Sequence, residues 1–255
     1  MRFAILGSGS RGNALVVESG RTRLLLDCGF GVRETVRRLA RLALSPEQLT
    51  GILVTHEHDD HIGGVVAFAR RFGLPVWVTP GTLRGLEGLF AGLTGLHLLE
   101  GYAPLCIGDI EVHPFAVPHD AREPAQYVFG DGERRLGVLT DTGGATALVT
   151  RMLSGCDALV LECNHDLDLL AGSDYPPPLK QRIASRFGHL DNAAAAALLT
   201  ALDRGRLQHV VAAHLSQSNN RPELARDALA GALGCEPDWV AIADQDAGLE
   251  WRVLA

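Results

Sequence analysis

The segment THEHDDHIGG (residues 55–64) concentrates three histidines and two aspartates in a chain that contains only ten histidines. A solvent-exposed charge run would pair its acids with Lys or Arg, whereas these acids accompany histidines. The apolar residues GILV before the segment predict a buried strand, and apolar residues at helical spacing follow it. The cluster is therefore expected where a strand ends and a helix begins, which is where open α/β folds bind their ligands.

Four members of this segment, His56, His58, Asp60 and His61, form the pattern HxHxDH. In an extended loop, His56 and His58 point the same way and can bind one ion, while Asp60 and His61 lie past the turn and can face a second ion. Imidazole and carboxylate groups suit Zn²⁺ or Mn²⁺, and Fe²⁺ is also compatible. Because one ion needs only three or four ligands, this pattern together with further candidates predicts two divalent metal ions.

Three other predicted strands end in residues of the same kind. His119 ends AVPH, Asp141 follows the apolar run of VLTDTG, and His214 ends VVAAH. A single histidine after an apolar strand is more often structural than functional. Three such residues in addition to HxHxDH favour one shared metal centre, to which separate strands each deliver a ligand.

Composition limits the classes of protein that this chain can be. It has 255 residues and is 47% hydrophobic, enough to bury a substantial core in one large domain or two small ones; the family resemblance described below implies a single domain over residues 1–255. No run approaches the ~18 apolar residues of a membrane span, the N-terminus predicts a strand rather than a signal peptide, and five scattered cysteines favour a reducing cytoplasm. The net charge of −7 argues against an extended nucleic-acid groove but permits a small phosphoester site, where bound metal ions supply positive charge.

Hydrophobic periodicity predicts strands and helices in two successive halves. The predicted strands cover residues 3–7, 14–19, 21–29, 51–56, 76–79, 110–119, 125–130, 135–143, 158–165, 209–216, 240–243 and 248–255. The predicted helices cover residues 32–42, a segment ending near 72, 179–187, 192–203 and 222–233. Asp131-Gly132 supplies hairpin turn chemistry. This mixture predicts an α/β fold in which two sheets pack together with helices outside.

The order D…HxHxDH…H…D…H resembles the metallo-β-lactamase superfamily, an αββα four-layer sandwich of two mixed β-sheets flanked by helices, with a dinuclear site. The resemblance implies one ion on His56, His58 and His119, a second on Asp60, His61 and His214, and a bridging Asp141. It also implies that Asp27, in LLLDCG, supports the metal-binding loop from behind the ligands, although a plain strand-end turn residue is the alternative.

Three stretches are similar to the bacterial YycJ/WalJ-type subfamily of metal-dependent hydrolases and exonucleases: residues 6–14, 161–199 and 214–220. Where this subfamily commonly has Ser in GHLSN, the chain has Asp191, which leaves the role of that loop open. The resemblance implies a phosphodiesterase or 5′-to-3′ exonuclease acting on DNA or RNA. A small-molecule hydrolase for a cyclic phosphodiester or a thioester, and a non-catalytic regulatory protein with a relic metal site, are the alternatives.

Further residues follow from the same resemblance. GHLDN resembles the GHS-type motif of tRNA-processing relatives, which implies that His189 contacts the scissile phosphate or assists the leaving group, while Asp60 orients the attacking water. Asp191 itself is predicted to cap the following helix. Asn164 and His165 are candidate substrate-binding residues, and a plain strand-end turn is the alternative. The SGSRGN loop (residues 8–13) is expected to form a tight hairpin rather than a phosphate cradle.

Overall fold

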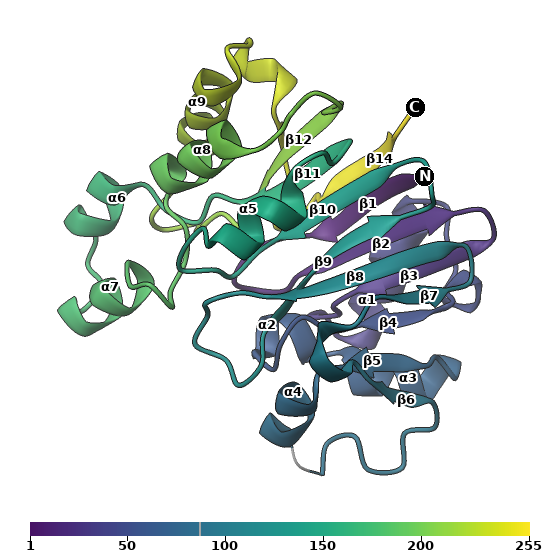
Figure 1. The fold of residues 1–255 in the computed structure, drawn as a ribbon. Coiled ribbons are helices and arrows are strands. Elements are labelled where there is room, and N and C mark those ends of the chain that lie inside the picture. The colour runs from purple at the N-terminus through teal and green to yellow at the C-terminus, as the bar shows by residue number, and fades with distance from the viewer. Residues whose placement is uncertain (87) are drawn as a thin grey trace.

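The computed structural model describes residues 1–86 and 88–255 and contains two seven-stranded sheets (Figure 1). The first sheet has the strand order β14 (Leu249–Val253), β1 (Arg2–Gly7), β2 (Ala14–Ser19), β3 (Thr22–Leu26), β4 (Gly51–Leu53), β5 (Val76–Val78), β6 (Leu96–Leu98). The second has the order β13 (Ala241–Ile242), β12 (His209–Ala213), β11 (Ala158–Glu162), β10 (Arg135–Leu139), β9 (Ala125–Gly130), β8 (Ile110–Ala116), β7 (Leu105–Ile107). Both sheets mix parallel and antiparallel pairs, as predicted.

Helices cover the outer face of each sheet. The α-helices are α1 (Val32–Arg41), α2 (Asp59–Ile62), α3 (Val65–Phe72), α4 (Pro80–Gly85), α5 (Ala147–Leu153), α6 (Leu167–Gly172), α7 (Pro177–Ile183), α8 (Asn192–Ala201) and α9 (Pro222–Leu233). Short 3₁₀ turns occupy η1 (Pro46–Gln48), η2 (Glu100–Tyr102) and η3 (Pro237–Trp239). Apolar residues of α1 and α3 pack on the first sheet, and those of α5, α8 and α9 pack on the second.

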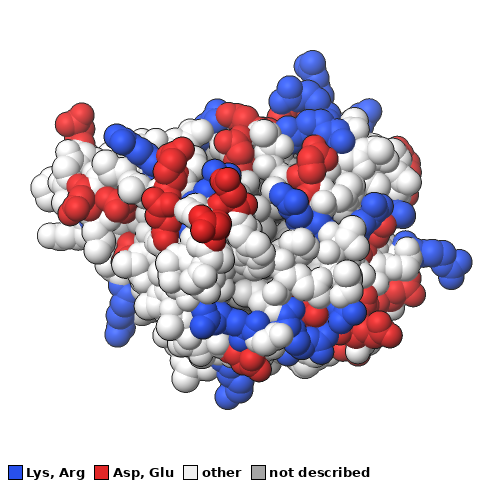
Figure 2. Space-filling view, turned by 90° about the horizontal axis from the view of Figure 1, so that it is seen from above, with Lys and Arg blue, Asp and Glu red and all other residues white. Residues whose placement is uncertain are grey.

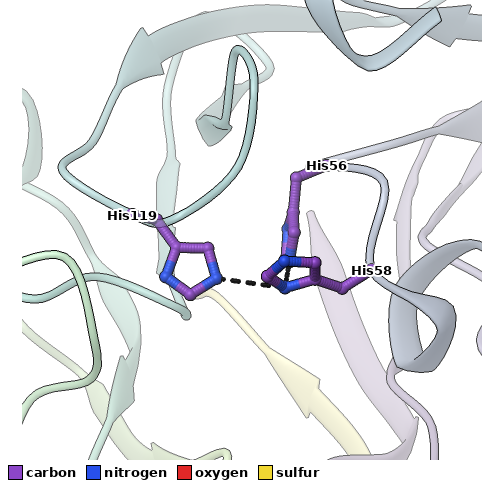
Figure 3. Close-up of side chains that lie close together, drawn as sticks. All are labelled: His56, His58 and His119. Atoms are coloured by element: carbon purple, nitrogen blue, oxygen red, sulfur yellow. Dashed lines mark hydrogen bonds between the residues drawn. The ribbon is translucent and has the colours of Figure 1, made fainter. Parts of the chain in front are cut away.

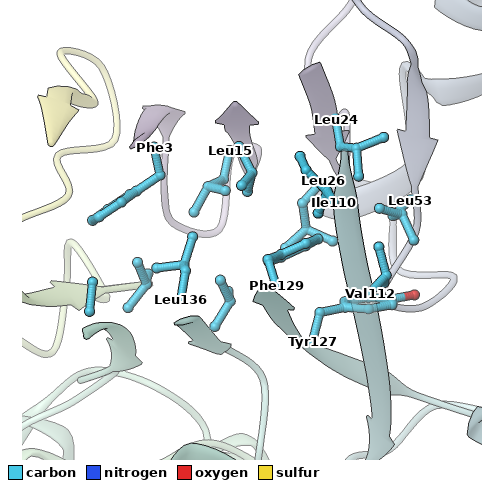
Figure 4. Packing of buried hydrophobic residues seen from close by; sticks show 14 of the residues in the cluster. Phe3, Leu15, Leu24, Leu26, Leu53, Ile110, Val112, Tyr127, Phe129 and Leu136 are labelled. Carbon is cyan, nitrogen blue, oxygen red and sulfur yellow. The ribbon is translucent and has the colours of Figure 1, made fainter. Parts of the chain in front are cut away.

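The inner faces of the two sheets form the central core. Phe3, Leu15 and Leu24 of the first sheet pack with Tyr127 and Phe129 of the second (Figure 4). Successive strand residues face opposite sides of a sheet, so the residues between them point outward and meet the helices. Burial on both faces explains why these strands are nearly continuous apolar runs rather than alternating ones. The predicted four-layer αββα architecture is confirmed.

Several predicted elements differ in detail. The Asp131-Gly132 hairpin is confirmed, because β9 and β10 pair antiparallel on either side of it. The helix after the histidine cluster is broken into α2 and α3 at Gly63 and Gly64, where a Cβ on Gly64 would lie 1.8 Å from the Phe30 carbonyl oxygen. The helix predicted over residues 179–187 begins and ends earlier, as α7.

Some short elements escaped prediction. The strands β6 and β7 and the helices α4, α5 and α6 have no counterpart among the predicted elements. Each strand has only three residues and each helix six or seven, too few for a periodic pattern to emerge. Among the helices of the described chain, none combines the length and hydropathy required to cross a membrane.

Candidate metal centre

The predicted ligands lie on loops that follow strands of both sheets, except Asp60 and His61, which lie in the short helix α2. His56 and His58 follow β4 of the first sheet, whereas His119, Asp141 and His214 follow β8, β10 and β12 of the second. The strands β10, β11 and β12 are parallel neighbours, so their carboxyl ends meet at one edge of the sheet. The two sheets therefore bring together residues that lie up to 158 positions apart in the chain, from His56 to His214.

The first cluster consists of three imidazoles that converge on one point (Figure 3). His58 Nδ1 lies 3.0 Å from His56 Nε2 and 3.3 Å from His119 Nε2. Burial, reinforced by the charge of His61, holds the pKa of His56 well below its ordinary value. The His56 ring is therefore neutral and can offer a lone pair, as a metal ligand must.

The second cluster contains Asp60, His61 and His214, with Asp141 beside it. His61 Nε2 lies 2.9 Å from Asp141 Oδ2, and His214 Nε2 lies 3.4 Å from Asp60 Oδ2 and 3.5 Å from Asp141 Oδ1. Asp141 also belongs to a group with His56 and His61. This carboxylate thus lies between the two clusters, where the resemblance placed a bridging ligand.

The chemistry of these residues fits a cation. Asp141 is buried, and its Oδ2 atom has no hydrogen-bond partner in the described chain, although the His61 ring is in close contact. Burial opposes ionisation of Asp141, but His214 and His61 outweigh it and hold its pKa well below the ordinary value. A buried, ionised and incompletely paired carboxylate is costly unless a cation binds it, and nitrogen donors surround this one.

Asp27 contacts Thr55 and His61, which flank the candidate ligands His56 and His58. Its Oδ2 lies 2.8 Å from His61 Nδ1 and accepts a 2.9 Å hydrogen bond from the Thr55 hydroxyl, while its Oδ1 accepts one from the Thr55 amide at 2.8 Å. The contact at Nδ1 orients the His61 ring so that Nε2 faces the second cluster. A carboxylate behind a ligating histidine commonly fixes its tautomer and orientation in metal sites.

Three of these strand-end residues have left-handed backbone conformations. The φ angles are 58° at Asp27, 51° at Asp141 and 54° at His214. Residues other than glycine rarely adopt this region, and those that do concentrate at functional sites, where the surrounding structure holds the strained turn. Each of these left-handed residues lies one or two positions after the end of its strand, at the site.

The SGSRGN loop forms the β1–β2 hairpin, which confirms the favoured prediction. Most of its amides are already used, because Gly9 N donates to Asn13 Oδ1, Arg11 N to Gln245 Oε1 and Gly12 N to the Gly9 carbonyl. These groups are not free to cradle a phosphate. The loop instead contacts the candidate metal centre through Asn13, whose side-chain Nδ2 donates to Asp60 Oδ2 at 3.1 Å. Sequence reasoning did not identify this contact.

Ser8, at the start of the same hairpin, contacts the opposite sheet. Its hydroxyl accepts a 2.8 Å hydrogen bond from the backbone amide of His214. The strained turn at His214 is therefore held by a residue 206 positions earlier in the chain. No local signal in the sequence identifies such a pair.

Glu162, the last residue of β11, is a second residue that sequence reasoning missed. It is fully buried, and its Oε1 lies 2.7 Å from His189 Nδ1, while its Oε2 accepts a 2.9 Å hydrogen bond from the Thr142 amide. Burial opposes its ionisation, but His189 outweighs burial and lowers the pKa of Glu162 to about 2. Glu162 directly follows the apolar run ALVL, and a polar residue after an apolar strand is the pattern that identified the predicted ligands.

The structure places His189 beside the clusters, 3.4 Å from Asp141 through Nδ1. Burial lowers the pKa of His189, but the carboxylate of Glu162 outweighs it and raises that pKa above the ordinary value. Since Nδ1 faces Glu162, Nε2 is the nitrogen left for the adjoining cavity, which His189 lines. His189 thus lines the cavity that adjoins both ligand clusters.

The remaining candidates, Asn164 and His165, and the nearby helix-capping residues have different environments. Asn164 Nδ2 donates to the His214 carbonyl at 3.0 Å and so supports a ligand loop. His165 is buried, lies outside the ligand groups, and neither ring nitrogen has a hydrogen-bond partner in the described chain. Asp166 caps α6 and Asp191 caps α8, as predicted for Asp191, each through its carboxylate.

Comparison with known proteins agrees with this geometry. The family model for the beta-lactamase superfamily domain matches residues 22–214. The chain belongs to this superfamily. It is 37% identical to the exodeoxyribonuclease YycJ of Bacillus anthracis over 91% of this chain and 89% of the relative. It is 33% identical to the exodeoxyribonuclease WalJ of Streptococcus pneumoniae over 99% of this chain and 93% of the relative.

Solved structures confirm the superfamily fold at lower identity. The metallo-beta-lactamase fold protein YhfI from Bacillus subtilis superposes with a TM-score of 0.76, at 17% identity and 98% coverage of both chains. A metallo-β-lactamase fold with this cluster of histidines and aspartates implies bound divalent metal ions. The chain is thus a hydrolase of the metallo-β-lactamase superfamily.

Proposed function

We propose that this protein is a dinuclear phosphodiesterase that removes nucleotides from an end of DNA, and that residues 1–255 act as one catalytic domain. The observation that carries the proposal is the set of two ligand clusters joined at Asp141, with the His189–Glu162 pair beside them. Two YycJ/WalJ-type relatives, similar over at least 91% of this chain, are named exodeoxyribonucleases. The 5′-to-3′ direction comes from the subfamily resemblance.

The proposed metal ligands are those that the resemblance implied. His56, His58 and His119 would hold one ion, and Asp60, His61 and His214 the other, with Asp141 shared. Zn²⁺ and Mn²⁺ match these nitrogen and carboxylate donors. When bound, such ions supply the positive charge that activates a water and neutralises charge developing on the phosphate oxygens.

The protein's own residues position the reacting groups. Asp60, held by Asn13, presents a carboxylate that orients the attacking water. His189, kept protonated by Glu162, donates from Nε2 to a phosphate oxygen or to the departing oxygen. Asp27 and Asn164 hold His61 and the His214 loop in place, so that the ligand geometry does not depend on the substrate.

Overall charge favours a second candidate, a hydrolase for a small cyclic phosphodiester or thioester. The net charge is −7, and acidic and basic side chains are interspersed on the face shown in Figure 2. A long nucleic-acid groove usually requires a basic stripe. The similarity to nucleases over most of the chain outweighs this consideration, because one local site can bind a strand end.

A substrate panel on metal-reconstituted protein tests the proposal. End-labelled single- and double-stranded DNA, RNA, bis-p-nitrophenyl phosphate, a cyclic nucleotide and a glutathione thioester would be compared. We expect stepwise shortening of DNA and about two metal equivalents per chain by elemental analysis. Asp141→Ala should abolish hydrolysis and lower the metal content while the circular dichroism spectrum stays unchanged. Hydrolysis of the thioester or cyclic nucleotide alone, or a stoichiometry of one, would contradict the proposal.

A further inference from the structure

Another cavity, here called the edge cavity, lies where the last strands of the two sheets meet. Residues of β13 and β14 line it, and β12 and β14 lie on the same side of the molecule in Figure 1. Its volume is about 420 Å³, within the range of about 300–1,000 Å³ typical of ligand pockets. Its lining includes the start of β12, whereas the candidate ligand His214 follows the end of that strand. The edge cavity shares no described residue with the cavity that His189 lines, so it is separate from the proposed active site.

Arg252 of β14 brings an unpaired donor to the edge cavity. It lies opposite Phe3 in the antiparallel pair of β1 and β14, and Phe3 packs in the central core. Because directly opposite residues share one face of a sheet, Arg252 also lies on the inner face. Its Nε atom is buried and has no hydrogen-bond partner in the described chain. A buried N–H group without an acceptor is costly and rare in native proteins, so a bound anion would supply the missing acceptor.

A second arginine lines the edge cavity from the helix layer of the other sheet. Arg226 belongs to α9, and its Nε donates to the Val240 carbonyl at 3.2 Å. Within the described chain its two terminal nitrogens have no acceptor. Asp238 also lines the cavity but forms no ion pair with either arginine among the described residues. Two guanidinium groups with free donors in one cavity match a phosphate, whose oxygens accept hydrogen bonds from both planar groups.

Trp239 adds an aromatic surface to the edge cavity. It lines the cavity and is 42% exposed. Trp251 is covered by Arg2, whose Cζ lies 4.2 Å from the ring centroid, and Trp77 stacks on His97. No aromatic ring or guanidinium group of the described chain stacks on Trp239. Its free ring surface is therefore available to stack on a planar ring of a ligand.

Hydrogen bonds between the two sheets fix the shape of the edge cavity. His209 Nε2 donates to the Val253 carbonyl at 2.9 Å. Gln208 Nε2 donates to the Ala255 carbonyl at 2.9 Å, and the Ala255 amide donates to Gln208 Oε1 at 2.8 Å. These bonds join the start of β12, in the second sheet, to β14 and the residues after it, in the first. Because the two edges are held by the protein itself, a ligand need not order them when it binds.

We propose that the edge cavity binds a small aromatic phosphate, the chemical class of a nucleoside monophosphate, with the phosphate on Arg226 and Arg252 and the planar ring on Trp239. This inference goes beyond the proposed function and does not depend on it, because none of the candidate metal ligands lines the edge cavity. The bound phosphate contacts a strand of the first sheet and a helix packed on the second. Binding should therefore raise the Tm of the metal-loaded protein.

The experiment titrates the metal-loaded protein with deoxyadenosine monophosphate, followed by tryptophan fluorescence and by calorimetry. Deoxyadenosine, which lacks the phosphate, and inorganic phosphate, which lacks the ring, are titrated in parallel. Because a phosphate can also bind at a metal centre, variants of the edge cavity identify the site: Arg226→Ala, Arg252→Ala, Arg252→Lys and Trp239→Phe. Arg151→Ala is the matched control, because this exposed arginine lies on α5, another helix of the second sheet, and outside the cavity lining.

We expect the monophosphate to quench tryptophan fluorescence, and Arg226→Ala and Arg252→Ala each to weaken that binding by about tenfold or more, the usual loss for a charged hydrogen bond. Arg252→Lys should recover only part of the affinity, because it keeps the charge without the planar fork. Trp239→Phe should abolish most of the quenching while calorimetric binding remains, because phenylalanine keeps a ring. Deoxyadenosine and inorganic phosphate should each bind about tenfold more weakly than the monophosphate or worse. The metal content should stay unchanged in every variant.

Several outcomes would overturn the proposal. If both alanine variants bind the monophosphate like Arg151→Ala, the binding belongs to another site. Quenching that persists in Trp239→Phe would place the ring elsewhere, and inorganic phosphate binding as tightly as the monophosphate would show that no ring is recognised. Absence of binding to the wild type at millimolar monophosphate would remove the site altogether. Circular dichroism monitors folding, and if Arg252→Ala is unfolded, Arg226→Ala and the wild-type quenching still decide the question.

Discussion

His189 and Glu162 form a pair, and the role proposed for His189 depends on both side chains. The three-histidine cluster and the cluster of Asp60, His61 and His214 each offer three donors without them. Glu162 stays ionised because its pKa is lowered to about 2, and its 2.7 Å contact with Nδ1 stabilises the protonated form of His189. A proton at Nε2 of His189 is then available to the cavity near neutral pH.

Replacement of His189 should separate chemistry from metal binding. We expect His189→Ala to keep both ions and most substrate affinity, while kcat falls by about 10² to 10⁴, the usual loss for a general acid or an oxyanion donor. The double variant with Glu162→Gln should be little slower than His189→Ala, because residues that act as a unit are not additive. Turnover within a few-fold of wild type would leave His189 only a packing role.

The pH dependence of kcat should depend on the His189–Glu162 pair. Because Glu162 raises the pKa of His189, the protonated form persists to higher pH than it would for an isolated histidine. Activity that needs this proton is present below that pKa and is lost as pH rises through it. Glu162→Gln should therefore shift the alkaline limb of the kcat profile to lower pH. An unshifted limb would show that another group controls it.

At the scale of secondary structure, the sequence could predict which residues lie at the ends of buried strands, where the candidate ligands gather. The runs before His56, Asp141 and His214 are buried on both faces, so the change to a polar residue marks the strand's end. The contacts of Ser8 and Asn13 with the metal loops could not be predicted, because they depend on how the first hairpin approaches residues 47 to 206 positions away. Periodicity describes one element at a time and contains no such information.

The loop before α8 provides an element-scale control for the catalytic prediction. Asp191 accepts a 2.8 Å hydrogen bond from the Ala194 amide and caps the helix two residues after His189. Asp191→Ala should lower the free energy of unfolding by about 0.5–2 kcal/mol, the usual cost of losing an N-cap. Measured by urea denaturation, that loss should accompany a kcat within a few-fold of wild type. A kcat loss as large as that of His189→Ala would instead indicate that the loop position controls catalysis.

At the scale of the whole molecule, the metal centre lies at the junction of the two sheets. His56 and His58 belong to the loop after β4 of the first sheet and His61 to the helix α2 that follows it, whereas His119 and His214 belong to loops of the second sheet. Metal ions bound to both sets would connect the two halves of the sandwich across the rim of the core. Without them, the acidic and imidazole groups must compensate one another's charge, as the close contacts of Asp141 with His61 and His214 indicate.

Metal binding should therefore release protons and alter the pH dependence of stability. Burial lowers the pKa of His214, but Asp141, Asp60 and Glu162 outweigh it and raise that pKa to about 10 in the metal-free protein. Since the folded-state pKa exceeds the unfolded one, this contribution to stability is fully present below about 6.5 and is lost as pH rises through about 10. Bound metal requires neutral imidazole, so metal affinity should rise with pH across the same window.

Two measurements test this expectation. Calorimetric titration of chelator-treated protein with Zn²⁺ at pH 7, in buffers of different ionisation enthalpy, should show release of about one proton or more. Thermal unfolding should show that the metal-free protein loses stability between pH 7 and pH 10, while the loaded protein has a higher Tm throughout. His113→Ala, which removes a histidine paired with Glu111 outside the ligand groups, should change neither result, whereas His214→Ala should reduce proton release. Proton release unchanged in His214→Ala would contradict the protonated state of this ligand.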